Sequence, residues 1–196
     1  MLAMERSTQE VEIKLRLGSA SEARERLTEL GASMVRPREF EDNVVFDREH
    51  DPLTSKDQVL RLREKGAAAL VTLKAPVEGS HRHKVREEHE TGIEDAAALT
   101  RILERLGFSP AYRYQKHRTT YDLDGLAVCL DETPIGCFVE LEGRPDAIDE
   151  VAQKLGFGPG DYICESYREL QLRDARERGE TAGDMLVPQR ETDSKP

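Results

Sequence analysis

The feature that most constrains this chain is a strict alternation of charged and apolar residues in segments of strand length. In residues 10–17, EVEIKLRL, every second side chain is charged and the others are aliphatic. A period of two is typical of a β-strand, because successive side chains point to opposite faces of a sheet. Further strand-like segments follow at residues 43–47, 59–64, 70–74, 83–90, 112–121, 126–131 and 137–142. The sequence therefore predicts eight strands.

Four other segments have the spacing of helices. They cover residues 20–30, 94–106, 146–155 and 163–177. A glycine follows each of the first three, as is common where a helix ends. An amphipathic helix needs an apolar partner, so the helices are expected to cover the apolar side of the strands. The pattern predicts one domain at 8–175, followed by a disordered polar tail at 176–196.

The charged faces of the predicted strands have no helices to pack against. They carry nine bases and seven acids, namely Lys14, Arg16, Arg61, Arg63, Lys74, Lys84, Arg86, Lys116, Arg118, Glu10, Glu12, Glu88, Glu90, Asp131, Glu140 and Glu142. Eight strands can close into a barrel, and a charged interior is stable only when a charged ligand and ions compensate it. The prediction is an α+β fold, an eight-stranded antiparallel β-barrel with helices packed on the outside and a polyanion with divalent cations inside. An open sheet whose charged face meets water is the alternative.

Two pairs of glutamates define the chemistry expected of such an interior. Glu10 and Glu12 share one face of a predicted strand, and Glu140 and Glu142 share one face of another. Carboxylate oxygens in this number suit Mg²⁺ or Mn²⁺, with Asp131 as a fifth acid. The arginines and lysines of the same faces suit phosphate oxygens. Acids and bases around one cavity favour phosphoryl transfer, which depends mostly on positioning and charge neutralisation.

The composition disfavours several other classes of protein. The 196 residues carry a net charge of −10, which argues against non-specific binding to nucleic acid. The sequence contains no apolar run of signal-peptide or membrane-span length, so we expect a cytoplasmic protein without a membrane partner. Its three cysteines, Cys129, Cys137 and Cys164, form no Cys-x-x-Cys motif and indicate neither a zinc site nor a disulfide framework.

Short motifs along the chain, taken in order, resemble those of the CYTH superfamily, the triphosphate tunnel metalloenzymes. They are Glu-x-Glu-x-Lys (10–14), Leu-Arg-Leu-Arg (60–63), Leu-Lys (73–74), Arg-x-Glu-x-Glu (86–90), Lys-x-Arg (116–118), Asp131, Gly-x-Phe-Val-Glu-Leu-Glu-Gly (136–143) and Ser-Tyr-Arg-Glu-Leu (166–170). The resemblance covers roughly residues 8–172. In length and spacing the chain is most similar to the class IV adenylyl cyclase-like subgroup.

The resemblance implies a barrel that forms a tunnel, and it assigns roles to the inward residues. The metal ligands would be Glu10, Glu12, Glu140 and Glu142, with Asp131 and Glu88 nearby. The triphosphate would be held by Lys14, Arg61, Arg63, Lys74, Arg86, Lys116 and Arg118. Lys74 and Lys14 are the residues expected to take part in catalysis.

The resemblance also implies an activity, the divalent-metal-dependent hydrolysis of inorganic triphosphate, thiamine triphosphate or a nucleoside triphosphate. Conversion of ATP to cyclic AMP and pyrophosphate is an alternative, and a non-catalytic polyphosphate or nucleotide sensor is a further one. The partner would be a small-molecule triphosphate, and a homodimer is left open. Many members carry Asp-x-Tyr-Phe-Asp after the first helix, whereas this chain has Val45 in place of the tyrosine within residues 43–47.

Overall fold

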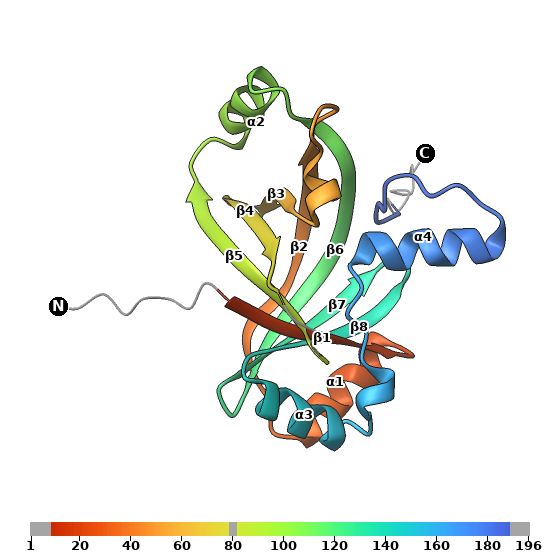
Figure 1. Cartoon of the computed structure of the whole chain (residues 1–196). Helices are drawn as coiled ribbons and strands as arrows, with labels where there is room; N and C mark the ends of the chain where they lie inside the picture. The colour runs from red at the N-terminus through yellow and green to blue at the C-terminus, as the bar shows by residue number, and fades with distance from the viewer. Residues whose placement is uncertain (1–8, 79–81, 189–196) are drawn as a thin grey trace, which may run out of the picture.

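The computed structural model describes residues 9–78 and 82–188, and its central feature is a closed antiparallel barrel (Figure 1). The strands are β1 (Gln9–Leu17), β2 (Ser33–Asp47), β3 (Val59–Lys65), β4 (Ala68–Pro76), β5 (Lys84–Ile93), β6 (Ser109–Leu123), β7 (Leu126–Thr133) and β8 (Gly136–Glu142). Their order around the barrel is β1-β5-β4-β3-β2-β6-β7-β8, and β8 pairs with β1. The predicted closed barrel of eight strands is thereby confirmed, and the open sheet is excluded.

The register of the strands sets opposite charges beside one another inside the barrel. Lys14 on β1 lies opposite Glu140 on β8, and Lys74 on β4 lies opposite Glu88 on β5. Directly opposite side chains on one sheet face are close enough to interact. A slip by one residue would turn the charged side chains outward and the aliphatic ones inward, so the alternation in the sequence fixes this register.

Of the ladders formed by the described residues, the one between β1 and β5 is the shortest. These strands share four registered residue pairs, from Gln9 to Glu12 on β1, whereas every other neighbouring pair of strands shares at least six. Glu10 and Glu12 on β1, and Lys84 and Arg86 on β5, line the interior along this seam. This ladder therefore carries two acids and two bases of the charged interior.

Four α-helices and two short 3₁₀ turns complete the described part of the chain. The helices are α1 (Ala20–Glu29), α2 (Ala96–Arg105), α3 (Pro145–Lys154) and α4 (Tyr167–Arg178), and the turns are η1 (Leu53–Lys56) and η2 (Pro159–Asp161). Three helices cover the aliphatic outer side of the barrel (Figure 1). α1 and α3 bury Leu27 and Ile148 in one core with Leu141 of β8, and α2 packs Leu103 against Phe46 of β2. No helix in the described part of the chain is long and apolar enough to cross a membrane.

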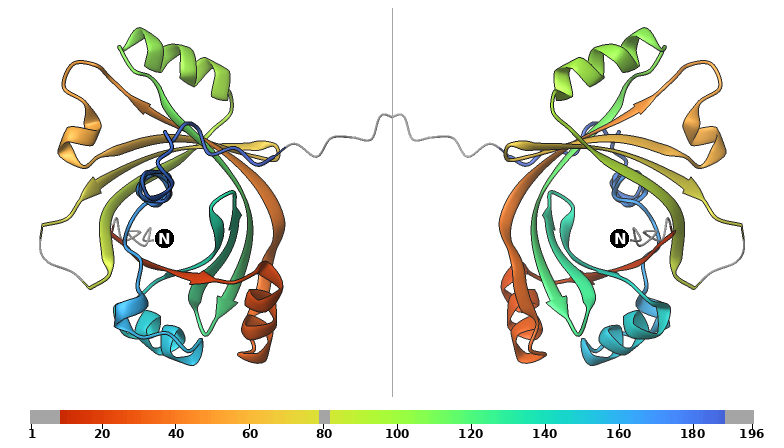
Figure 2. Two further views of the ribbon diagram at one scale, coloured as in Figure 1. Left: turned by 90° about the vertical axis from the view of Figure 1, so that its right-hand side faces the viewer. Right: turned by 90° about the vertical axis from the view of Figure 1, so that its left-hand side faces the viewer.

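α4 departs from the expectation that the helices cover the outer face. Figure 2 shows it end-on within the outline of the barrel, so its axis runs along the barrel rather than around it. Tyr167 and Leu170, at its start, are buried in one cluster with Tyr114 of β6 and Phe138 of β8. Both strand residues have the inward parity of their strands, so the start of α4 fills part of the barrel interior with apolar side chains.

The C-terminal segment differs from the disordered tail predicted at 176–196. α4 continues to Arg178, and the backbone of Met185 hydrogen-bonds to that of Arg113 (2.9 Å) and of Gln115 (2.8 Å) on β6. The Met185 side chain is 2% exposed and belongs to the same cluster as Tyr114. The buried side chain of Met185 therefore holds this polar segment against β6. The composition of the segment alone does not predict such a contact. Residues 189–196 of the predicted tail lie outside the described residues.

β2 is longer than the strand predicted at 43–47. It begins at Ser33 and passes through Pro37 and a run of charged residues, where register shifts near Arg36 break the strict alternation. These irregularities conceal the period of two in the sequence. The added length brings Glu41 into the interior, where its side chain is fully buried.

We predict that Met185→Ala lowers the free energy of unfolding by about 2 kcal/mol or more, because truncating a buried methionine leaves a cavity. Leu186→Ala is the matched control, since the neighbouring Leu186 side chain is 43% exposed. Its loss should stay within about 0.5 kcal/mol, as is usual for surface positions. Urea unfolding of the two variants measures both effects, and equal losses would show that this segment does not dock in solution.

Candidate functional site

One cavity of about 920 Å³ lies in the barrel interior, and we call it the tunnel cavity. Twelve of the thirteen predicted site residues line it, namely Glu10, Glu12, Lys14, Arg61, Arg63, Lys74, Arg86, Glu88, Lys116, Arg118, Glu140 and Glu142. The thirteenth, Asp131, is fully buried and does not line it. The structure thus brings together residues that lie 132 positions apart in the chain, from Glu10 to Glu142.

Among the residues that the structure describes, the wall of the tunnel cavity holds equal numbers of the two charge types, nine Lys or Arg and nine Asp or Glu side chains. This differs from the nine bases and seven acids counted on the predicted strands. The strand pattern missed the acids Asp47, Asp57 and Glu169, which line the cavity from the end of β2, the loop before β3 and the first turn of α4. The interior therefore has no surplus of positive charge.

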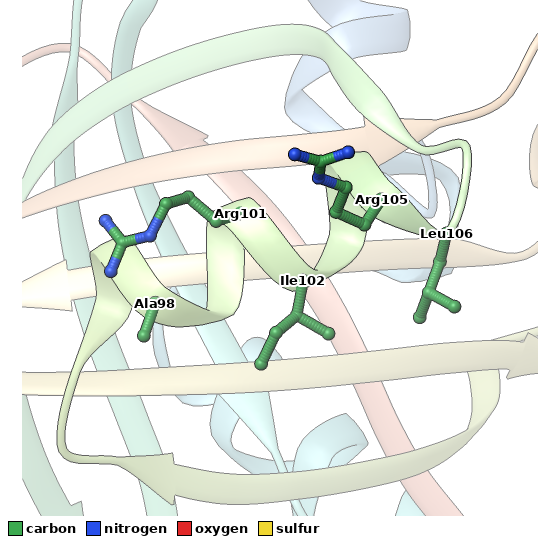
Figure 3. A pocket seen from close by; sticks show the side chains of 5 residues that line it. All are labelled: Ala98, Arg101, Ile102, Arg105 and Leu106. Atoms are coloured by element: carbon green, nitrogen blue, oxygen red, sulfur yellow. The ribbon is translucent and has the colours of Figure 1, made fainter.

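A second hollow, of about 390 Å³, lies on the outer side of α2 and does not suit the predicted chemistry. Ala98, Ile102 and Leu106 point to one side of the helix, and Arg101 and Arg105 point away from them (Figure 3). Its lining includes no carboxylate, hydroxyl or imidazole group. The tunnel cavity is therefore the candidate functional site.

One part of the tunnel cavity is a group of acids and lysines from β1, β4, β5 and β8. We call Glu10, Glu12, Glu88, Glu140 and Glu142 the glutamate cluster. Glu12 Oε1 lies 2.9 Å from Nζ of Lys14 and 3.1 Å from Nζ of Lys84. Nζ of Lys74 contacts Glu10 and lies 3.0 Å from Glu88. Each of these lysines is thus bound to a carboxylate that the sequence analysis assigned to metal.

Two members of the glutamate cluster lack sufficient positive charge. Burial raises the pKa of Glu10 to about 7, because the nearby charges of Glu12 and Glu88 add to the desolvation and Lys74 only partly opposes it. Burial also raises the pKa of Glu142, again reinforced by Glu12. Glu142 forms no ion pair with any of the residues that the structure describes. Both carboxylates would therefore be stabilised by an additional cation.

Glu12 and Glu140 have the opposite electrostatic balance. Burial acts to raise the pKa of Glu12, but Lys14 and Lys84 lower it by more, so the pKa ends below its usual range. The pKa of Glu140 is lowered in the same way against the effect of burial, chiefly by Arg118 and Lys14. These two carboxylates stay ionised and hold the lysines in place.

The donor types of the glutamate cluster fit a divalent cation. Among residues 9–78 and 82–188, no three Asp, Glu, His or Cys side chains are grouped so that they would hold a metal as they stand. The ammonium group of Lys14 lies between Glu12 (2.9 Å) and Glu140 (3.4 Å) instead. Glu12 and Glu142 are direct cross-strand partners, and Glu142 and Glu10 need more positive charge. Carboxylates of this kind are the ligands that Mg²⁺ and Mn²⁺ prefer.

Asp131 organises two of the predicted phosphate-binding residues from behind the wall. It accepts hydrogen bonds from Nζ of Lys116 at 2.7 Å and from Nε of Arg118 at 2.6 Å. The Tyr167 hydroxyl donates to it at 2.6 Å. With these donors around it and no exposed surface, Asp131 fixes the directions of Lys116 and Arg118. Its role as a metal ligand stays a prediction.

Arg61 and Arg63 on β3 are held mainly by neutral groups. Arg61 donates to the hydroxyls of Thr72 at 3.1 Å and of Tyr114 at 3.3 Å, and Arg63 donates to Oδ1 of Asn43 at 2.9 Å. Their carboxylate neighbours are 3.5 Å or more away. These two arginines are therefore well placed to exchange their partners for phosphate oxygens.

Besides Asp47 and Glu169, four residues of the site were not expected from the sequence: Glu41, Asp57, Tyr114 and Tyr167. Tyr114 carried a signal, because it precedes Lys116 by two residues in the same alternation. Glu41 and Asp57 carried none, since one lies beside Asp42 and Asn43 without an alternating apolar residue and the other lies in a loop. Tyr167 lies in the Ser-Tyr-Arg-Glu-Leu motif, but its contact with Asp131 depends on the position of α4.

We predict that Glu10→Gln raises the free energy of unfolding of the metal-free protein at pH 8 by about 1–3 kcal/mol. The pKa of Glu10 is about 7 in the folded protein against a model value of 4.5. The folded state therefore binds more protons, and stability falls as the pH rises from the unfolded to the folded pKa. The gain should be full at pH 8 and absent at pH 4, as measured by urea unfolding with a chelator.

Glu12→Gln is the matched control for this experiment. Because the pKa of Glu12 is lowered in the folded protein, its charge stabilises the folded state above the unfolded pKa, and its removal should destabilise the protein at pH 8. A change of the same sign in both variants at pH 8 would contradict the charge balance described for the glutamate cluster.

Comparisons with known proteins point to one family. The model of the CYTH domain family matches residues 8–167. A protein of Methanocaldococcus jannaschii named "Putative adenylate cyclase" is 28% identical over 173 residues, which cover 83% of this chain and 98% of the relative.

Solved structures share the fold. One from Vibrio parahaemolyticus, also described as a putative adenylate cyclase, superposes with a TM-score of 0.74 at 19% identity and covers 84% of this chain and 98% of its own. One from Hippeastrum, described as an adenylyl cyclase candidate with a dominant triphosphatase activity, has a TM-score of 0.59 at 21% identity, covering 88% and 97%. The family match over most of the chain, together with the closed eight-stranded barrel, shows that this chain belongs to the CYTH family, whose members are metal-dependent proteins that act on triphosphates.

Proposed function

We propose that this protein is a divalent-metal-dependent enzyme that hydrolyses a triphosphate-bearing substrate, such as inorganic triphosphate, thiamine triphosphate or a nucleoside triphosphate. The observation that carries the proposal is the balance of nine cationic and nine carboxylate side chains that the described part of the chain places around one cavity in a closed barrel. A triphosphate carries several negative charges, so a balanced interior would accept it only together with added cations.

Glu10, Glu12, Glu140 and Glu142 would hold Mg²⁺ or Mn²⁺, which supplies neutralising charge for phosphate oxygens when bound. The carboxylates would then no longer need their lysine partners. Lys14, Lys74 and Lys84, which now pair with these acids or with Glu88, would be free to bind the triphosphate. Arg61, Arg63 and Arg118 would bind its other oxygens through their planar forks of donors.

Lys14 and Lys74 are proposed to act as fixed cations rather than as bases. Burial acts to lower the pKa of Lys74, but Glu10 and Glu12 raise it by more, so the ammonium form prevails. The pKa of Lys14 is raised against burial by Glu12 and Glu140. A buried cation beside the transferred phosphoryl group stabilises the charge that develops there without giving up a proton.

Cyclisation of ATP with release of pyrophosphate is the second candidate. The name of the Methanocaldococcus jannaschii relative supports it, and the volume of about 920 Å³ lies in the range of pockets that hold drug-sized ligands. The triphosphatase activity described for the Hippeastrum protein supports hydrolysis. Both reactions would use the same glutamates and bases and would differ in the attacking oxygen and in the phosphorus atom attacked.

The test incubates the protein with tripolyphosphate, thiamine triphosphate or ATP, each with Mg²⁺, Mn²⁺ or a chelator, and separates phosphate, pyrophosphate and cyclic AMP. We expect metal-dependent release of phosphate and a loss of about a hundredfold or more in Lys74→Ala. Lys56→Ala is the control, because Lys56 pairs with Asp51 in the β2–β3 loop. Cyclic AMP as the main product would support the cyclase instead, and no product from any triphosphate would support the sensor.

We predict that Asp57→Asn tightens the binding of a triphosphate about threefold to tenfold, because Arg86 is otherwise held by Asp57. Arg86 donates to Oδ2 of Asp57 at 2.6 Å and also to its carbonyl oxygen, and a substrate must break this ion pair. Asn retains the shape and tolerates the left-handed backbone of this position, φ 52°. Calorimetric titration with magnesium imidotriphosphate, whose P–N–P bridges resist hydrolysis, measures the change.

Asp51→Asn is the matched control, since Asp51 also has a left-handed backbone, φ 59°. It pairs with Lys56 and Arg48 on the loop and does not line the tunnel cavity. Equal effects of the two variants would show that the ion pair with Arg86 does not compete with the substrate.

A further inference from the structure

Tyr114 occupies an unusual place among the tyrosines of this chain. It lies on β6 with its ring buried against the rings of Tyr112 (5.6 Å between centroids) and Tyr167 (6.4 Å). The residue is part of the lining of the tunnel cavity, and its hydroxyl reaches across to β3, where it lies 3.3 Å from the Arg61 guanidinium. A phenol is therefore part of the surface that binds phosphate under the proposed function.

The contact with Arg61 leaves the hydroxyl proton of Tyr114 free to be donated. A guanidinium has only donors, so the phenol oxygen is the acceptor in this hydrogen bond. In the described residues, the Tyr114 hydroxyl donates to no protein acceptor. Tyr167 and Tyr162 differ, because their hydroxyls donate to Asp131 (2.6 Å) and Asp149 (2.9 Å).

The groups that face the Tyr114 hydroxyl are mostly cations. Arg61 and Arg63 come from β3, and Lys116 comes from β6. Burial acts to raise the pKa of Tyr114, but these three charges lower it to about 8. Glu90 and Glu41 pair with Arg61 (3.7 Å) and Arg63 (3.5 Å), and neither accepts the phenol proton.

The other elements around Tyr114 offer no acceptor for its proton either. Tyr112 stacks on it from the same strand, Tyr167 packs against it from α4, and Nδ2 of Asn43 on β2 donates to its backbone carbonyl. A free donor surrounded by cations is a place where an anion would complete the hydrogen bonding and the charge balance together.

We propose that Tyr114 is a further binding residue for the triphosphate, accepting a hydrogen bond from Arg61 and donating its own proton to a phosphate oxygen held by Arg61 and Lys116. The inference rests on the proposed function and adds a neutral donor to a site of charged ones. It also carries a pH dependence, since the phenolate that forms above pH 8 cannot donate and repels the anion.

The test is a calorimetric titration of the whole chain with magnesium imidotriphosphate at pH 7 and pH 9. Tyr114→Phe keeps the ring and removes only the hydroxyl, and it should weaken binding roughly 10-fold to 100-fold at pH 7. The deficit should shrink at pH 9, where the wild-type phenol is ionised. Tyr121→Phe is the matched control, because Tyr121 lies on the same strand in the outer core and should bind within about twofold of wild type at both pH values.

A second measurement follows the phenolate itself by ultraviolet absorbance in the wild-type protein. The pKa values of Tyr112 and Tyr167 are raised, and that of Tyr162 is raised to about 12, chiefly by burial. Tyr114 should therefore ionise before these three. Saturating magnesium imidotriphosphate should shift this ionisation to higher pH, because the bound anion stabilises the phenol and offsets the cations. This readout does not depend on the folding of any variant.

The outcomes separate this inference from the proposed function. If wild type binds imidotriphosphate and Tyr114→Phe binds it equally at both pH values, only the role of Tyr114 is overturned. A deficit that is the same at both pH values, with no shift of the phenolate, would make Tyr114 a packing residue and would also overturn the inference. No binding by wild type at either pH would overturn both proposals.

Discussion

Pairing of charges inside a closed barrel is the interaction on which the rest of this structure depends. An unpaired ion costs several kcal/mol to bury, and this fold turns the charged faces of its strands inward. The register makes this tolerable by setting Lys14 opposite Glu140 and Arg118 opposite Asp131. Buried ion pairs add little net stability. The aliphatic outer core therefore holds the barrel together, and the inner charges decide what the barrel can accept.

The interior has two electrostatic regions, and one side chain connects them. The glutamate cluster needs positive charge, while the arginines of β3 and the bases of β6 can accept negative charge. The ring of Tyr167 lies 5.5 Å from Nζ of Lys14 in the first region and 5.1 Å from Nζ of Lys116 in the second, and its hydroxyl binds Asp131. α4 thereby orders bases of both regions at once. A ligand with a metal at one end and phosphates at the other matches this division.

The barrel, its charged lining and most site residues could be predicted because all of them follow from one local period. Glu10, Lys74 and Glu140 were assigned to the interior by alternation alone, and twelve of the thirteen predicted site residues line the tunnel cavity. What could not be predicted depends on tertiary contacts. Glu41 lies beside Asp42 and Asn43, where no apolar residue marks the outer face of the strand, and Asp57 reaches Arg86 from a loop without a period.

The helices show the same division between local and tertiary information. The three outer helices followed from their apolar stripes. α4 has no comparable stripe pointing to a single neighbour, and the docking of its start at the barrel interior arises from Tyr167, Leu170 and the later contact of Met185. The even charge balance of the cavity was likewise hidden, because Asp47, Asp57 and Glu169 enter it from outside the alternating part of the strands.

The ladder between β1 and β5 places two acids of the interior beside two of its bases. Among the described residues this ladder has four registered pairs, and both of these acids lie opposite bases, Glu10 opposite Arg86 and Glu12 opposite Lys84. Glu10 and Glu12 stand on one side of the seam, and Lys84 and Arg86 stand on the other. A metal triphosphate bound by the side chains of both strands would link β1 to β5. The loaded barrel would then resist separation of β1 from β5 better than the empty one.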